Sequence, residues 1–271
     1  MKNILTFTDF SEIADNAVNT AFAIAKKYSA KLFIYHNSEK GDLLELDLNN
    51  LNKAKIANHP EAINKYASMA NQLEIDTNFI LGDGFFNEKI KSVAEDLSID
   101  LIIMGSTGAG GKEEVFLGSN TERIIRSVDI PVLTIKSPID TINFKTVVFA
   151  SSFDEIEQST FIHALDLLKL PTETTIHLVS IDTTSFFAQP TVLMVEAMKD
   201  FEKIASDYTV EKHFYADYSV DAGIRHFLEE VKPDLLIMSN KFDKPLKHFW
   251  QGNNAIRAVN HSEFPVLTID Y

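Results

Sequence analysis

The stretch that decides the fold is residues 100–135, DLIIMGSTGAGGKEEVFLGSNTERIIRSVDIPVLTI. Without a gap it aligns with residues 234–269, DLLIMSNKFDKPLKHFWQGNNAIRAVNHSEFPVLTI, and both segments close with Pro-Val-Leu-Thr-Ile. Residues 4–12 (ILTFTDFSE) align in the same way with residues 147–155 (VVFASSFDE). Copies of this length are far too long for a solenoid repeat, so the sequence predicts two domains of one fold.

The boundary between the copies falls near residues 136–144, where Ser137, Pro138 and Asp140 supply turn-forming residues. We therefore expect a first domain over residues 1–137 and a second over 138–271. The second copy is shorter, and the difference lies between about residues 39 and 79 of the first copy.

Short apolar runs alternate with helical patterns in the first copy. The runs at 4–7, 32–35, 75–81, 101–104 and 132–135 show little alternation, which is typical of strands covered on both faces. A helix is predicted after the first run, with Ser11 as its N-cap and one apolar face made of Ile13, Ala17, Ala21, Ile24 and Tyr28. Two more helices are predicted around 90–97 and 124–128, and residues 41–73 are read as a loop followed by a helix from about Pro60. Strand–helix repetition predicts an α/β fold with a parallel sheet and helices on both faces.

Composition narrows the class of protein. The 271 residues are 45% hydrophobic and 24% charged, which is typical of a globular protein. A formal net charge of −14 disfavours nucleic acid and anionic membrane surfaces as partners. There is no cysteine. Asp9 and Glu12 come too early for a secretory signal, and no apolar run is long enough to span a membrane, so we expect a cytoplasmic protein.

Glycines are concentrated in one loop. Seven of the ten lie between residues 82 and 118, and five of these fall within 105–118. Neither a Walker A loop nor a Gly-x-Gly-x-x-Gly fingerprint fits their spacing. What stands instead is Gly105, two residues, Gly108, nine residues, then Gly118-Ser119.

This spacing, after a strand that ends Met-Gly and before Pro-Val-Leu, resembles the ATP-binding motif of the universal stress protein family. The opening ILTFTDFSE, the strand LFIYHNSE and the loop Gly82-Asp83-Gly84 resemble other landmarks of that family. The resemblance covers nearly the whole chain as two tandem copies. It implies two Rossmann-like domains, each a five-stranded parallel sheet of order 3-2-1-4-5, paired through their last strands.

The resemblance also implies a nucleotide-dependent stress-response or regulatory protein that binds ATP, with any Mg²⁺ held by the phosphates. The physical reading agrees, because a helix that opens at Gly118-Ser119 presents free N–H groups to an anion. The residues that match the family's nucleotide-binding positions are Thr8, Asp9, Asn37, Met104, Gly105, Thr107, Gly108, Gly118, Ser119 and Asn120.

Two of these residues have a purely structural alternative. Ser119-x-x-Glu122 is a capping box, which explains the serine without a ligand. The alternative for Asp9 is a carboxylate that caps the following helix. Both alternatives stay open at this point.

The second copy keeps Gly118 as Gly252 but has lost most of the other residue types of this site. Asp9 becomes Ser152, Gly105 becomes Ser239 and Gly108 becomes Phe242, while Gly111 becomes Pro245. Phenylalanine places a side chain where phosphate is expected, and proline removes a backbone donor. The prediction is one ATP per chain, in the first domain.

Other chemistry has less support. No general base accompanies the glycine loop, so no catalytic residue is assigned and binding is favoured over turnover. The eight histidines include no close sequence pair such as His-x-x-x-His, so no metal site is assigned either. A slow ATP-hydrolysing or nucleotidyl-transferring enzyme and a ligand-free interaction module remain as alternatives. We expect an intramolecular pseudo-dimer and an unidentified protein partner, and leave a homodimer of whole chains open.

Overall fold

A computed structural model describes residues 1–38, 44–50, 60–83, 86–106, 119–137, 139, 142–183, 192–239 and 254–270. These residues belong to two compact units. The first contains Met1–Ser106 and Val132–Ile142, and the second contains Thr107–Pro131 and Asn143–Tyr271. The expected boundary between residues 137 and 138 stays a prediction.

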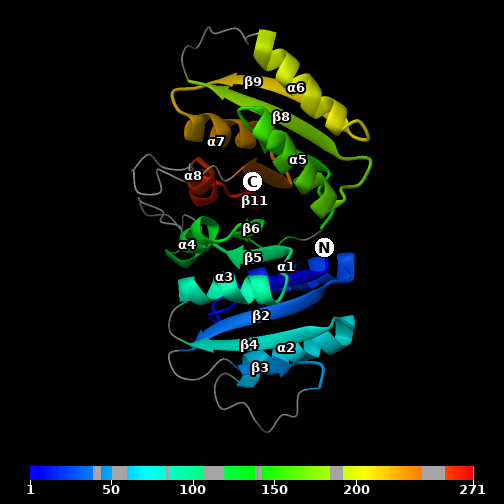
Figure 1. The fold of residues 1–271 in the computed structure, drawn as a ribbon, viewed down its shortest axis with the longest axis vertical. Helices are drawn as coiled ribbons and strands as arrows, with labels where there is room; N and C mark the ends of the chain where they lie inside the picture. The colour runs from blue at the N-terminus through cyan, green and yellow to red at the C-terminus, as the bar shows by residue number, and fades with distance from the viewer. Residues whose placement is uncertain are drawn as a thin grey trace. The chain divides into compact units, whose positions relative to one another are not determined.

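The first unit is built on five parallel strands (Figure 1). Their order is β4-β2-β1-β5-β6, which is third, second, first, fourth, fifth along the chain and confirms the predicted topology. The strands are β1 (Asn3–Phe7), β2 (Lys31–Ser38), β4 (Thr77–Asp83), β5 (Leu101–Gly105) and β6 (Val132–Ile135).

One strand was not predicted. β3 (Leu44–Asp47) pairs antiparallel with β4 at the edge of this sheet, so reading the whole stretch before Pro60 as loop is wrong at these four residues. Its sequence LELD alternates leucine with acidic residues, and Glu45 and Asp47 are exposed. Four residues of alternation are too few to predict a strand, and only the open edge of β4 gives them backbone partners.

Helices of the first unit agree with the predicted pattern. α1 (Glu12–Tyr28) begins at the Ser11 N-cap, whose side chain accepts from the Ala14 amide at 3.2 Å. The apolar face of α1 is buried, including Ala17, Ala21 and Ile24. α2 (Pro60–Leu73) and α3 (Phe86–Asp96) follow β3 and β4.

The second unit repeats the same order, β9-β8-β7-β10-β11. Its strands are β7 (Thr146–Ala150), β8 (Thr175–Asp182), β9 (Thr209–Ala216), β10 (Leu235–Ser239) and β11 (Val266–Ile269). Its helices are α5 (Glu155–Leu168), α6 (Val192–Ile204), α7 (Val220–Val231) and α8 (Asn254–His261), and α4 (Ser119–Ser127) lies in the segment that clusters with this unit.

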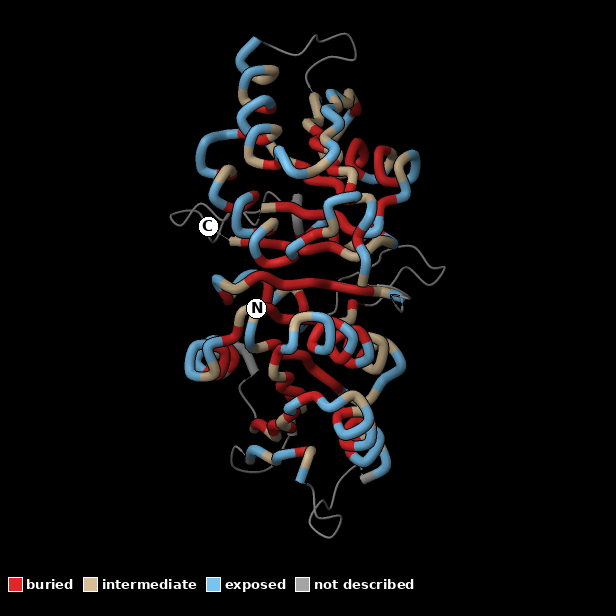
Figure 2. The backbone as a smooth tube through the Cα atoms, turned by 90° about the vertical axis from the view of Figure 1, so that its right-hand side faces the viewer, coloured by how far each residue is buried: buried red, intermediate tan, exposed pale blue. Residues whose placement is uncertain are grey.

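The core of each unit lies along its central strands, which are buried on both faces (Figure 2). Four consecutive residues are buried in β1, β5, β7 and β10. This explains the continuous apolar runs in the sequence, because helices cover both faces of a parallel sheet. Among the described residues, no helix is both long and apolar enough to cross a bilayer.

Both units turn the chain in the same way after their first strand. Phe10 has a φ of 64° and Phe153 a φ of 57°, in the left-handed region. The Phe10 amide donates to the Thr8 hydroxyl at 3.0 Å, and the Phe153 amide donates to the Ser151 hydroxyl at 2.8 Å. Each turn encloses one residue, Asp9 in the first unit and Ser152 in the second, and this residue lies just beyond the carboxyl end of the first strand of its unit.

Candidate functional site

Five of the predicted site residues lie at or just after the carboxyl ends of β1, β2 and β5, where the strand order reverses: Thr8, Asp9, Asn37, Met104 and Gly105. β1 lies between β2 and β5, with Thr6 in register with Ile34 on one side and Ile103 on the other. Asp9 follows β1, and Asn37 lies near the end of β2. Parallel α/β sheets bind ligands in the crevice at such a reversal, outside the carboxyl ends of the strands.

Asp9 presents an exposed carboxylate at this edge. Its Oδ1 accepts from the Ser11 amide at 2.9 Å, while Ser11 itself is the N-cap of α1. Ser11, not Asp9, is thus the N-cap, and Asp9 orders the turn before the helix. Partial burial raises the pKa of Asp9, but hydrogen bonds with Ser11 and the nearby His36 ring outweigh it, so the pKa is lowered overall and the side chain is anionic near neutral pH.

Thr8 is buried and its polar atoms are bound within the protein. Its amide donates to the Tyr35 carbonyl at 2.9 Å, and its hydroxyl lies 3.1 Å from the Tyr66 hydroxyl. Tyr66 in turn donates to Asp15 at 2.6 Å, and burial followed by this hydrogen bond raises the pKa of Tyr66. The chain of bonds ties the end of β1 to α1 and α2, so Thr8 positions the turn that carries Asp9.

His36 and Asn37, near the end of β2, differ in exposure: His36 is half-buried, whereas Asn37 is exposed. The Nδ1 atom of His36 lies 2.8 Å from the Thr8 carbonyl, and its ring packs against Phe10 at 4.5 Å. His36 therefore packs and hydrogen-bonds within the protein. Asn37 is exposed. It is open to a ligand at the same edge as Asp9.

The end of β5 comes close to the start of α1. A Cβ atom on Gly105 would lie 2.7 Å from the Ile13 carbonyl oxygen, so only glycine lets the two backbones approach this closely. Met104 is buried in the strand, and Ser106 is 1% exposed with no hydrogen-bond partner for its hydroxyl among the described residues. An unpaired buried hydroxyl at the start of the glycine loop fits a site that a ligand completes.

The remaining predicted residues are only partly described. Thr107, Gly108 and Gly118 lie outside the described residues, and of Ser119 the structure describes the backbone, as the first residue of α4. Asn120 is exposed in the first turn of α4. Glu122 pairs with Arg126 at 2.7 Å. The capping-box alternative for Ser119 stays open.

The corresponding edge of the second unit is filled by a carboxylate of the protein itself. Glu157 is 3% exposed in the first turn of α5, where the first copy has Ala14. It accepts from the Ser239 hydroxyl at 2.6 Å and the Ser152 amide at 3.0 Å, and also from the Ser151 hydroxyl. These serines stand where the first copy has Gly105, Asp9 and Thr8, so a buried carboxyl group of the protein occupies the ends of β7 and β10.

Comparison with known proteins decides the family. The sequence model described as the universal stress protein family matches residues 1–136. The chain belongs to the universal stress protein family. A universal stress protein of Methanocaldococcus jannaschii is 32% identical over 154 residues, which covers 50% of this chain and 94% of that protein.

Two longer matches extend over both units of this universal stress protein. One of Synechocystis sp. is 27% identical over 300 residues, with 99% of each chain covered. The crystal structure of a universal stress protein from Archaeoglobus fulgidus has a TM-score of 0.67 at 16% identity, and covers 99% of this chain and 98% of its own. The tandem arrangement is thus shared at the level of the fold.

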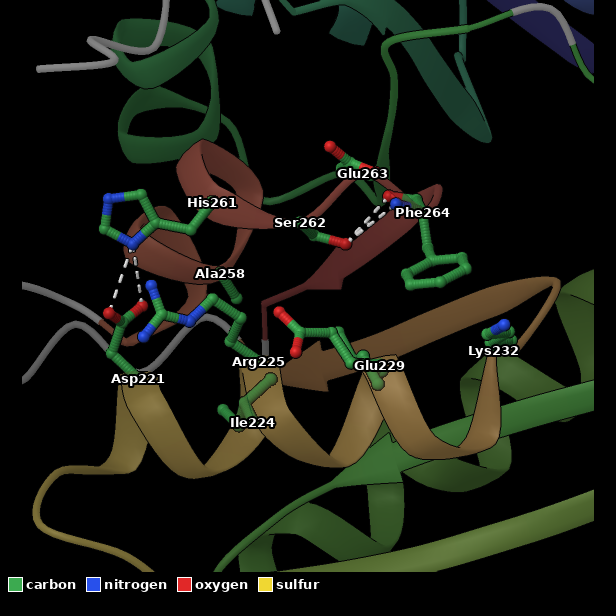
Figure 3. Close-up of a pocket in the computed structure, with 11 residues that line it drawn as sticks. Asp221, Ile224, Arg225, Glu229, Lys232, Ala258, His261, Ser262, Glu263 and Phe264 are labelled. Carbon is green, nitrogen blue, oxygen red and sulfur yellow. Dashed lines mark hydrogen bonds and ion pairs between the residues drawn. The ribbon is translucent and has the colours of Figure 1, made fainter. Parts of the chain in front are cut away.

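A separate cavity of about 480 Å³ lies between α7 and α8 of the second unit (Figure 3). Its lining mixes acidic and basic side chains, including Asp221, Arg225, Glu229 and Lys232. His261 Nδ1 lies 3.1 Å from both carboxylate oxygens of Asp221. This contact joins the two helices across the cavity, and the lining presents neither sign of charge alone to a ligand.

Glu157 is the site residue of this universal stress protein that the sequence interpretation missed. The aligned segments FSEIAD (10–15) and FDEIEQ (153–158) place it opposite Ala14. An acidic residue opposite a small apolar one was the available signal. The role of Glu157 depends on three serines at the ends of β7 and β10, Ser151, Ser152 and Ser239, and only the tertiary structure brings these serines and Glu157 together.

Proposed function

We propose that the first copy, residues 1–137, binds one ATP per chain and that the second copy, residues 138–271, binds none. The observation that carries this proposal is the contrast between the two strand-end sites. The first copy has Ala14 at the position of Glu157 and has glycines in the loop after β5, whereas the second copy has the Glu157 carboxyl group hydrogen-bonded to Ser152 and Ser239 at the ends of β7 and β10. A buried carboxylate repels the polyphosphate that the glycine loop is suited to hold.

Each residue at the first site has a distinct part in the proposal. Backbone amides of the loop after Gly105, which contains Thr107, Gly108 and Gly118, hold the phosphates together with those of Ser119 and Asn120 at the start of α4. Asp9 and Asn37 contact the nucleoside at the ends of β1 and β2. Thr8 and Met104 position these ends, and Mg²⁺ is held by the phosphates.

Calorimetric titration of ATP, with and without magnesium, tests the proposal. Wild-type protein is expected to bind one equivalent. Gly108→Phe imports the residue of the second copy and should weaken binding by more than about tenfold, or about 1.4 kcal/mol. The matched control, Phe242→Gly, should leave one equivalent per chain, because Glu157 still fills the second site.

Asp9→Ala and Ser152→Ala form a second matched pair. Asp9→Ala should weaken ATP binding, whereas Ser152→Ala changes the equivalent position in the second unit and should not. Two equivalents bound by the wild type, or unchanged affinity in Gly108→Phe, would show that the site is wrongly placed. No binding at all would favour a ligand-free interaction module.

For the cellular role, we propose that the bound nucleotide controls recognition of a protein partner in the stress response. The loop that follows β5 is the part of the chain that ATP would hold, so a partner that reads this loop distinguishes the bound state. Partner recovery with and without ATP, using Gly108→Phe as the nucleotide-blind control, tests this step. Equal recovery of the partner with and without ATP, in the wild type and in Gly108→Phe, would show that ATP binding does not control partner recognition.

A further inference from the structure

Two histidines and a glutamate gather on adjacent strands of the second unit, away from the strand-end site. His177 of β8 is in register with Glu211 of β9, and Val179 is in register with His213. Residues two apart along a strand share a face of the sheet, so His177, Glu211 and His213 face the same side. The His213 ring lies 4.9 Å from Phe227 of α7, which places the cluster on the face that α7 covers.

The ligand-type atoms of the three residues lie close together. His177 Nδ1 is 3.0 Å from His213 Nε2 and 3.4 Å from Glu211 Oε2, and the latter two atoms are 3.7 Å apart. Tetrahedral zinc, with bonds of about 2.0–2.1 Å, requires neighbouring ligand atoms about 3.3–3.4 Å apart. The three observed separations bracket this value, so small side-chain shifts suffice to hold an ion.

We propose that His177, Glu211 and His213 form a binding site for a zinc-class divalent cation, with a fourth position open to water. Imidazole nitrogen and one carboxylate oxygen are ligands that zinc accepts, whereas magnesium and calcium prefer oxygen alone. Side-chain exposure is 12% for His177, 29% for His213 and 53% for Glu211, so solvent and an ion can reach the cluster.

The first unit shows what this part of the fold contains without the cluster. The paired registers place Phe33, Asn78 and Ile80 at the positions of His177, Glu211 and His213. Phe33 and Ile80 are buried core residues there. The fold therefore does not require imidazoles at these positions, and the second copy has exchanged two apolar side chains for two that bind metal.

The cluster lies at the edge of the sheet of the second unit. Among the described strands, β9 is the edge strand of this unit and pairs with β8, so an ion bound here would fasten the edge of the sheet.

Zinc titration of the full chain, stripped with a chelator and kept free of nucleotide, tests the site. Wild type should bind one more equivalent than His177→Phe or His213→Ile, each of which imports the residue of the first unit. Glu211→Gln changes an exposed side chain without altering its size. This variant should bind the zinc ion of the cluster roughly tenfold more weakly or worse, since loss of even an outer-shell partner lowers metal affinity by about 10–100-fold. The matched control is His163→Gln, at an exposed histidine on α5, which should bind as wild type does.

Two spectroscopic readouts keep the test independent of variant stability. Cobalt(II) in the site should show the visible absorption of tetrahedral coordination, and zinc should shift the imidazole NMR signals of His177 and His213 in the wild type. Equal stoichiometry and affinity in the wild type and all three cluster variants would overturn the proposal. Unshifted imidazole signals at saturating zinc would do the same, and would leave a hydrogen-bonded histidine pair.

Discussion

At the scale of single residues, the difference between the two units depends on Glu157. Its carboxylate is buried and accepts hydrogen bonds from donors at the ends of β7 and β10. A buried charge is tolerated only when its hydrogen bonds are made, so the three serines and Glu157 require one another. The same position in the first unit is Ala14, which brings no carboxyl group to the ends of β1 and β5.

Glu157→Ala is predicted to destabilise the second unit. Loss of a charged acceptor leaves the Ser151, Ser152 and Ser239 donors without their partner, and we expect the free energy of unfolding to fall by about 2–3 kcal/mol. Urea unfolding followed by circular dichroism measures the change. Glu155→Ala, at an exposed residue of the same helical turn, should stay within about 0.5 kcal/mol of the wild type. Equal losses for the two variants would contradict the role given to Glu157.

Asp9 predicts a pH dependence at the acid end. Because its pKa is lowered in the folded protein, ionised Asp9 stabilises the fold above its unfolded pKa of about 3.9. That contribution is lost as the pH falls through the folded pKa. Asp9→Asn should therefore melt below the wild type near neutral pH, and the difference should shrink to zero in strong acid. The effect is small, since Asp9 is exposed. A constant difference at every pH would exclude the charge as its cause.

At the scale of elements, a glycine is required where a helix and a strand approach so closely that no side chain fits between them. Gly105 of β5 faces the Ile13 carbonyl of α1, whose backbone cannot move without shifting the helix. Gly223 of α7 faces the Cγ2 atom of Ile181, a side-chain atom of β8. A side chain repacks more readily than a helix backbone shifts, so the two glycines differ in how well they tolerate alanine.

Gly105→Ala is predicted to lower the free energy of unfolding by about 2–3 kcal/mol, since the added methyl overlaps the backbone of α1. Gly223→Ala should cost less, because alanine regains about 1 kcal/mol of helix propensity in the interior of α7. Denaturant unfolding of both variants measures the two losses. A larger loss for Gly223→Ala would contradict the account of the α1–β5 contact.

At the scale of the whole molecule, one fold occurs twice with different chemistry in each copy. The first unit has the open strand ends proposed for ATP, and the second has the cluster proposed for zinc. Each ligand should act on the unit that contains its site. Pairing of the two copies through β6 and β11 stays a prediction.

Hydrogen exchange followed by mass spectrometry separates the two ligands. ATP at about a hundred times its dissociation constant should slow exchange up to about a hundredfold in peptides that cover residues 3–16 and 31–38. Zinc should instead slow exchange in residues 175–182 and 209–216. Residues 31–38 and 77–83 are the matched control for zinc, because they form the corresponding strands of the first unit, which lack the cluster. Protection by zinc in these control peptides would contradict the separate action of the two ligands.

The amino-acid sequence by itself determined the tandem copies, the alternation of strands and helices, and the position of the glycine loop, whereas the strand order was implied by the resemblance to the universal stress protein family. The copies follow from the internal alignment, and the elements follow from local patterns: buried strands are continuous apolar runs, α1 has a helical apolar face, and a capping serine stands at its start. Only the tertiary structure decided that Glu157 closes the second site and that β3 forms at the edge of β4. It also decided that His177 and His213, distant in sequence, lie 3.0 Å apart. The physical reason is that such contacts join different strands and helices, so their distances are set by how the elements pack and by the register of the sheet.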